Sequence, residues 1–253
     1  MRFASLGSGS RGNAALIEEG GTRLLLDCGF STSAVQRRLG RLDLSPDQLT
    51  GIVVTHEHSD HLGGVARLAA RYRLPVWMTP GTHTAWRGED GVAVHLFSAH
   101  EPFAIDALEL VPFPVPHDAR EPCQFVFTNG ARRLGVLSDT GVITPFIRHQ
   151  LNACDALMVE CNYDPQMLAG GPYPESLKQR VASRLGHLSN HQAGDLLRHL
   201  DTRHLQHMVV GHVSEKNNTP ALASASAAEA LGCSADWVTV AAQAGGFGWR
   251  DIV

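Results

Sequence analysis

One short segment of the chain contains four potential metal ligands within six consecutive residues: His56, His58, Asp60 and His61. Imidazole and carboxylate groups are the usual protein ligands of zinc and related ions. On extended backbone, residues two apart, such as His56 and His58, face the same way, and the other two can face a second ion. A polar loop of unrelated surface histidines is the alternative interpretation, and the specific spacing disfavours it.

The motif stands between an apolar stretch of strand length and a helical pattern. Ile52–Thr55 is a compact buried strand by its composition, and His61–Tyr72 has the apolar spacing of a helix. The pattern His-x-His-x-Asp-His after an apolar strand resembles the hallmark of the metallo-β-lactamase superfamily. This resemblance implies further ligands at later strand ends, and His117, Asp139 and His212 stand at such junctions. A single histidine at a strand end is more often structural, but these three residues, in register with the first motif, support one another as ligands.

The resemblance implies a two-metal site with the ligands shared between two ions. It assigns one ion to His56, His58 and His117, the other to Asp60, His61 and His212, and a bridging position to Asp139. Zinc is the expected metal, with manganese as an alternative because His-containing, oxygen-rich dinuclear sites accept it. Such a pair lowers the pKa of a clamped water and produces a hydroxide nucleophile.

Short apolar runs and helical patterns alternate along the whole chain, without a linker that divides it. Expected strands are Arg2–Leu6, Ala14–Glu18, Arg23–Asp27, Ile52–Thr55, Pro75–Thr79, Leu108–Val115, Gln124–Thr128, Arg133–Ser138, Ala156–Cys161, His207–Gly211 and Asp236–Ala242. Expected helices are Ser31–Leu39, His61–Tyr72, Glu175–Arg184, His191–His199 and Pro220–Leu231. The pattern favours two sheets between helix layers. With the resemblance, it predicts an α/β fold: a four-layer αββα metallo-β-lactamase sandwich, a single domain over residues 1–253.

Composition favours a globular, cytoplasmic protein. The formal charge of −4 and the pI of about 6.4 give no general basic footprint for nucleic acid, although bound metal ions supply local positive charge. The five cysteines form no C-x-x-C pair, which is typical of reduced thiols, and we expect them in the core. The N-terminus lacks the apolar stretch of a signal peptide, and no segment has the length of a membrane span.

Several further segments resemble the YycJ/WalJ family of bacterial exonuclease-like proteins. They are Ser5–Asn13, Leu26–Gly29, Ala156–Asn162, Gly171–Arg180, Gly186–Asn190 and His212–Pro220. The resemblance covers nearly the whole chain and implies a metal-dependent phosphodiesterase that acts on nucleic acid, as a 5′→3′ exonuclease on DNA or RNA ends. Two positions depart from the family: Cys28 stands where a small residue is expected and Tyr163 where a histidine is expected. We assign Tyr163 no catalytic role.

The same resemblance implies three catalytic residues: His187, Glu160 and Asp60. A histidine at the place of His187 contacts the scissile phosphate or protonates the leaving oxygen in related phosphodiesterases. A carboxylate such as Glu160 orients an imidazole and raises its pKa, which suits a general acid. Asp60 borders the nucleophile and can orient it. The alternatives are a helix-start residue without a role for His187 and a structural buried acid for Glu160.

Polar residues of the family-like segments are expected substrate contacts. They are Ser8, Ser10, Asn13, Lys178, Arg180, Asn190 and Asn217. The first three lie in a Gly-rich turn whose side chains and N–H groups can bind phosphate, or simply form the turn. Lys178 and Arg180 are two apart on an expected helix and do not share one face, so we expect at most one to reach phosphate.

Two other functions compete with a nuclease. A small-substrate metallo-hydrolase of the same fold would act on a thioester, a lactone or a small phosphodiester. Only about forty residues follow His212, too few for the C-terminal helical region of glyoxalase II-like thioesterases. A non-catalytic scaffold with structural zinc is disfavoured, because structural sites are saturated by Cys and His. The 72 residues between Asp139 and His212 also exclude the inserted domain of ribonuclease J.

Overall fold

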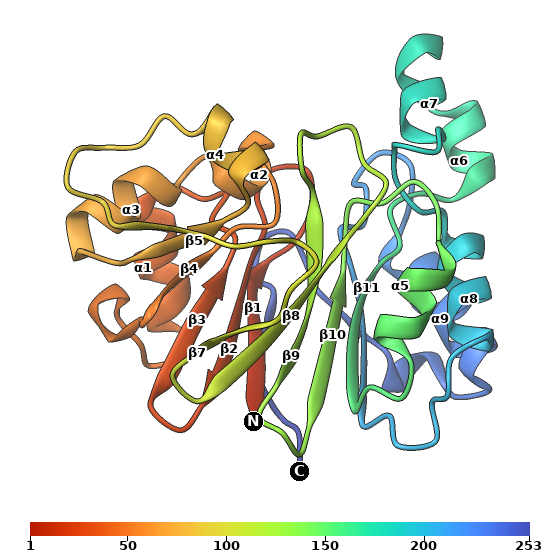
Figure 1. Cartoon of the computed structure of the whole chain (residues 1–253). Coiled ribbons are helices and arrows are strands. Elements are labelled where there is room, and N and C mark those ends of the chain that lie inside the picture. Colours follow the sequence, from red (N-terminus) through yellow and green to blue (C-terminus); the bar gives the residue numbers. More distant parts are fainter.

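Two seven-stranded sheets face each other in a computed structural model that describes all residues, 1–253 (Figure 1). The first sheet contains, in spatial order, β14 (Phe247–Asp251), β1 (Arg2–Gly7), β2 (Ala14–Glu19), β3 (Thr22–Leu26), β4 (Gly51–Val53), β5 (Val76–Met78) and β6 (Val94–Leu96). The second contains β13 (Thr239–Val240), β12 (His207–Gly211), β11 (Ala156–Glu160), β10 (Arg133–Leu137), β9 (Cys123–Thr128), β8 (Leu108–Pro114) and β7 (Phe103–Ile105). Each sheet is antiparallel in its early strands and parallel in its later ones, apart from the antiparallel edge strand β14.

Helices cover the outer face of each sheet, so the expected four-layer αββα arrangement is confirmed (Figure 1). The helices are α1 (Thr32–Gly40), α2 (Ser59–Leu62), α3 (Val65–Tyr72), α4 (Pro80–Ala85), α5 (Pro145–Leu151), α6 (Pro165–Gly170), α7 (Glu175–Val181), α8 (Asn190–Arg198) and α9 (Pro220–Leu231). In Figure 1, α1 and α3 lie outside the first sheet, whereas α5, α8 and α9 lie outside the second. None of these helices has both the length and the apolar character needed to cross a membrane.

Three apolar cores hold the four layers together. Phe3, Phe125 and Phe127 are fully buried in the core between the two sheets. A second core joins α1 and α3 to the first sheet, and a third joins α8 and α9 to the second. The central strand β11 is buried at every residue. This explains its apolar run over Ala156–Val159, because a parallel strand covered on both faces needs no polar alternation.

The carboxyl ends of parallel strands from both sheets meet at one end of the sandwich. Strands β3 and β4 lead there from the first sheet, and β10, β11 and β12 lead there from the second. In Figure 1 this end is at the top, between α2 and the α6–α7 pair. Side chains that directly follow these strands therefore converge, although they are distant in sequence.

The expectation of one continuous helix over residues 61–72 is wrong. The helix is split into α2 and α3 at Gly63 and Gly64. The Gly64 N–H donates to the Cys28 carbonyl (2.7 Å), and a Cβ at Gly64 would lie 1.8 Å from the Phe30 carbonyl oxygen. The close approach of the loop after β3 therefore interrupts the helix, which a hydrophobic period does not reveal.

The expected final strand, Asp236–Ala242, is also largely wrong. A 3-10 turn occupies Ala235–Trp237, and the strand β13 has only two residues. The true last strand, β14, was not expected; it pairs with β1 as an edge of the first sheet. Two more edge strands, β6 and β7, and the helices α4, α5 and α6 were not expected either. These elements have three to seven residues, too few to establish a clear period.

Candidate metal centre and active site

The structure brings the seven expected metal ligands together at the convergent strand ends. Potential ligand atoms of His56, His58 and His117 lie within 4.8 Å of one another, and those of Asp60, His61 and His212 form a second such group. These are the same two sets that the superfamily resemblance assigns to two ions. Asp139 lies between them: its Oδ2 is 3.1 Å from His61 Nε2, and its Oδ1 is 3.2 Å from His212 Nδ1.

Four of the histidines are oriented alike by a hydrogen bond at Nδ1. The acceptors are Thr55 Oγ1 for His56 (2.9 Å), Asp27 Oδ2 for His61 (2.7 Å), the Gly186 carbonyl for His117 (3.1 Å) and Glu160 Oε1 for His212 (3.0 Å). Thr55 donates its own hydroxyl proton to Asp27 (2.9 Å), so its lone pair is free to accept. With the proton on Nδ1, each neutral ring keeps an unprotonated Nε2, as metal-ligating histidines do when a second group fixes the tautomer.

Several atoms of the cluster are buried without a hydrogen-bond partner. They include Nε2 of His56, Nε2 of His212 and Oδ1 of Asp139. His58 is reversed: its Nδ1 lies 3.2 Å from His117 Nε2. Buried polar atoms are normally satisfied, so the three unpartnered atoms indicate a positive group that they would share. This donor set fits divalent cations, which is the chemistry that the sequence predicts.

Burial and neighbouring charges shift the pKa values of these side chains in opposite directions. Burial lowers the pKa of the His56 imidazole well below its ordinary value, which keeps the ring neutral. Burial also disfavours a charge on His212, but the Asp139, Asp60 and Glu160 carboxylates together outweigh this effect and raise the pKa of His212 to about 10. The carboxylates around His212 therefore favour positive charge in that part of the cluster.

Three residues of the site adopt a left-handed backbone conformation. Asp27, Asp139 and His212 have φ values of 60°, 51° and 50°. Asp27 and His212 directly follow strands that end at the site, and Asp139 follows such a strand after one intervening residue. Asp and His tolerate this conformation better than most residues, but it is uncommon and carries a conformational cost. The turn directs each side chain back over the strand ends, toward the ligand cluster.

His187 and Glu160 form the pair that the family resemblance implies. His187 Nδ1 lies 2.7 Å from Glu160 Oε1. The Glu160 side chain is fully buried at the end of β11, whereas His187 is 22% exposed and lines a cavity over the ligands. Burial disfavours the charged imidazole, but the Glu160 and Asp139 carboxylates together outweigh this effect and raise the pKa of His187. Glu160 also orients His212, so one carboxylate positions both a ligand and its neighbour.

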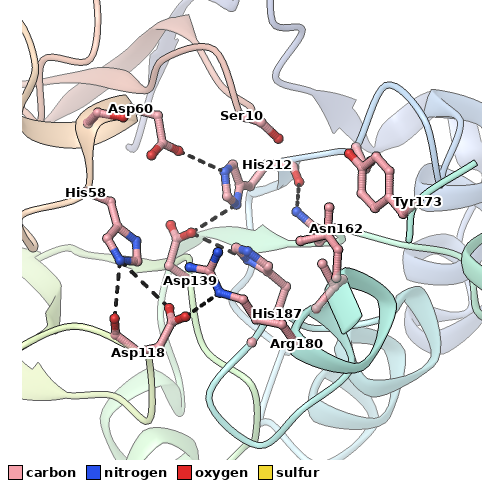
Figure 2. A pocket seen from close by; sticks show the side chains of 15 residues that line it. Ser10, His58, Asp60, Asp118, Asp139, Asn162, Tyr173, Arg180, His187 and His212 are labelled. Carbon is pink, nitrogen blue, oxygen red and sulfur yellow. Dashed lines mark hydrogen bonds and ion pairs between the residues drawn. The ribbon is translucent and has the colours of Figure 1, made fainter. Parts of the chain in front are cut away.

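A cavity of about 360 Å³ opens above the ligand cluster (Figure 2). Ser10 and Arg180 line it, as expected for substrate contacts. Ser8 and Asn13 do not line it: Ser8 Oγ accepts from the His212 N–H (2.8 Å), and Asn13 Nδ2 donates to Asp60 Oδ2 (3.2 Å). These two residues hold ligands in place instead.

The other expected substrate contacts lie outside the cavity. Asn190 is buried and hydrogen-bonded to Asn218 (2.9 Å). Asn217 is buried, and its N–H donates to Ser214 Oγ. Lys178 donates to the Ala169 carbonyl (2.6 Å) and lines a different groove. Residues two apart on a helix diverge, so Arg180 faces the cavity and Lys178 does not.

Some residues of the site were not singled out from the sequence. Asp27, after β3, orients His61; Asp118, next to His117, holds the Arg180 guanidinium (2.6 Å). The sequence offered one signal for each residue: Asp27 stands at a strand end, and Asp118 is adjacent to an expected ligand. Tyr173 lines the cavity from the segment before α7.

The structure also shows where Tyr163 and the five cysteines lie. Tyr163 is buried, packs with Leu168 and Val181, and does not line the cavity. Four of the five cysteines are buried as expected, but Cys233 is exposed, so the expectation of core thiols is wrong there. Cys233 follows the helix-ending Gly232 at the surface, beyond the buried face of α9.

Comparisons with known proteins decide the family. The family model described as "Beta-lactamase superfamily domain" matches residues 22–212. The chain is 33% identical over 235 residues to the exodeoxyribonuclease YycJ of Bacillus anthracis, covering 91% of this chain and 89% of that protein. The chain belongs to the YycJ/WalJ family of the metallo-β-lactamase superfamily.

Two further similarities agree with this family. The exodeoxyribonuclease WalJ of Streptococcus pneumoniae is 31% identical over 230 residues, with 88% of this chain and 85% of that protein covered. The metallo-β-lactamase fold protein YhfI of Bacillus subtilis superimposes with a TM-score of 0.77 at 15% identity, over 98% of each chain, which shows the shared fold. Family membership and the clustered ligands together identify a metal-dependent hydrolase.

Proposed function

We propose that this YycJ/WalJ family member is a phosphodiesterase that degrades nucleic acid from its ends, as a 5′→3′ exonuclease on DNA. One observation carries the proposal: full-length similarity to two exodeoxyribonucleases coincides with a His187–Glu160 pair beside the ligand cluster. The family resemblance supplies the 5′→3′ direction of degradation.

Two divalent ions, with zinc as the first candidate and manganese as the second, would be held by the residues that the structure groups. His56, His58 and His117 would hold one, and Asp60, His61 and His212 the other, with Asp139 shared between them. Such ions lower the pKa of bound water and neutralise the charge that develops on a phosphoryl group.

His187 is suited to protonate the oxygen that leaves phosphorus. Its Nδ1 proton is held by Glu160, so the opposite nitrogen, Nε2, is the one that can carry a second proton to a substrate. Glu160 also raises the pKa of His187 and so favours the protonated ring. Asp60 is 21% exposed at the cavity wall, where its carboxylate can accept a hydrogen bond from the attacking water and orient it.

The proposal is tested with DNA and RNA labelled at one end, single- and double-stranded, with and without a 5′-phosphate, in Zn²⁺ or Mn²⁺. We expect release of mononucleotides from the 5′ end of DNA. His187→Ala should lower kcat by about 10²- to 10⁴-fold while metal content, measured by elemental analysis, is retained. Asp60→Ala should lose activity and part of its metal.

The control is His191→Ala, which removes an exposed histidine that does not line the cavity. Its activity should equal that of the wild type. Metal-loaded protein that cuts no nucleic acid, but hydrolyses a small phosphodiester, lactone or thioester, would overturn the nuclease proposal and leave the hydrolase fold intact. Release from the 3′ end would overturn the polarity.

A further inference from the structure

The cavity over the ligand cluster has two chemically different sides. The metal-ligand side is polar and includes His58, Asp60 and Asp139. The apolar lining side chains come from a single segment of the chain, the nine residues that lead into and form α7: Tyr173, Leu177 and Val181. Leu177 and Val181 are four residues apart on α7 and therefore share one face. One helical segment thus adds an apolar wall to an otherwise polar cavity.

Tyr173 is presented to the cavity in a restricted conformation. Pro172 and Pro174 flank it, and proline limits the backbone on both sides. The ring is partly buried and packs against the small core formed by Tyr163, Leu168 and Val181. Figure 2 shows Tyr173 on the opposite rim from His58 and Asp118. An aromatic ring that is already ordered loses little entropy when a ligand stacks on it.

Arg180 lies on the same helix and supplies the positive charge of this wall. It is the only lysine or arginine that lines the cavity. Its guanidinium is held by Asp118 (Nε to Oδ2, 2.6 Å) and stays largely exposed, so its remaining N–H groups are free for a phosphate oxygen. The wall therefore offers an aromatic face, aliphatic contacts and one cation within a single segment.

We propose that Tyr173, Leu177 and Val181 form a nucleoside subsite, in which a nucleobase stacks on Tyr173 while Arg180 contacts the attached phosphate. A cavity of about 360 Å³ lies at the lower end of the range of small-ligand sites, which suits one nucleotide. A wall of three side chains covers one heterocycle, and it does not form the apolar channel that an acyl chain needs. This subsite rests on the proposed function and adds recognition of the nucleotide that carries the attacked 5′-phosphate to it.

The test compares two substrates with the same leaving group on the metal-loaded protein. Thymidine 5′-(4-nitrophenyl phosphate) carries a base, and methyl 4-nitrophenyl phosphate does not. Tyr173→Ala should raise KM for the thymidine ester about 10- to 100-fold, the range for loss of a base-stacking aromatic, and change kcat/KM for the methyl ester less than about threefold. Tyr173→Phe should retain wild-type values, because it keeps the ring.

Gln179→Ala is the matched control, since it alters an exposed residue of α7 outside the cavity. It should leave both substrates unaffected and show the same melting temperature as Tyr173→Ala within a few degrees. Equal losses on both substrates in Tyr173→Ala would mean that the ring supports the reacting groups generally, and this would overturn the subsite.

Equilibrium binding separates failure of the subsite from failure of the proposed function. Calorimetry would measure the affinities of thymidine 5′-monophosphate and 2-deoxyribose 5-phosphate for the metal-loaded protein. We expect the nucleotide to bind at least about tenfold tighter, and Tyr173→Ala to remove this difference. If neither ester is cleaved but the difference is present, the subsite stands and the phosphodiesterase proposal fails. If the two ligands bind equally, the subsite is wrong, whatever the activity.

Discussion

Asparagine in place of Asp27 should weaken metal binding at His61 while the protein stays folded. Asp27 is buried and accepts three hydrogen bonds: from the Thr55 N–H (2.8 Å), from the Thr55 hydroxyl (2.9 Å) and from His61 Nδ1 (2.7 Å). An asparagine oxygen can still accept from Thr55. Its NH₂ group, facing His61, would donate to Nδ1 and thereby place the ring proton on Nε2, the atom that faces the other ligands.

The magnitude follows from the loss of this orienting bond. Removing a group that positions a metal-ligating histidine typically costs 10- to 100-fold in metal affinity, which corresponds to about 1.4 to 2.8 kcal/mol. The metal-free protein should also lose about 1 to 3 kcal/mol of unfolding free energy, because a charged buried acceptor of several hydrogen bonds becomes neutral.

Competition with a chromogenic chelator would measure the Zn²⁺ affinity, and urea denaturation of the metal-free protein would measure stability. Glu18→Gln is the matched control: Glu18 is also a buried carboxylate, but it pairs with Arg2 and Arg23 toward the other end of β2. It should lower stability and leave metal affinity unchanged. An Asp27→Asn protein with wild-type Zn²⁺ affinity would refute the orienting role of Asp27.

Three further predictions concern the backbone, the metal and the thiols. Gly64→Ala should lower the free energy of unfolding by at least about 3 kcal/mol, because its Cβ would lie 1.8 Å from the Phe30 carbonyl oxygen. Gly40→Ala has open space around the new Cβ and should raise the free energy of unfolding by up to about 1 kcal/mol. Guanidinium denaturation of both variants would measure these changes. Zn²⁺ at 100 times its Kd should stabilise the wild type by about 2.7 kcal/mol in thermal denaturation, and a His56→Ala protein that gained as much would contradict the ligand assignment. Ellman's reagent should label one thiol, Cys233, in the native protein and all five after denaturation. A buried thiol reacts slowly because it stays protonated, and burial raises the pKa of Cys28 to about 12. Fast labelling of a second thiol in the native protein would therefore show that the core opens.

The ligand set could be identified from local sequence because its spacing carries the information. His56, His58, Asp60 and His61 follow one strand directly, and parallel strands bring their carboxyl ends to one edge. The structure accordingly groups them with the later histidines as the resemblance implied. The long central strands and the four-layer order were predictable for the same reason, since buried parallel strands have continuous apolar runs.

Short elements and orienting contacts were decided only by the tertiary structure. Edge strands such as β14 contain too few residues for a period and exist because a neighbour such as β1 offers hydrogen bonds. Asp27 and His61 are 34 residues apart, and no local pattern links them until the loop after β3 contacts α2. Likewise, Tyr173 becomes part of a cavity wall only because α7 lies over the strand ends. The sequence by itself thus determined which groups can bind metal, whereas long-range packing determined which atom of each group points into the ligand cluster and which side chains line the cavity.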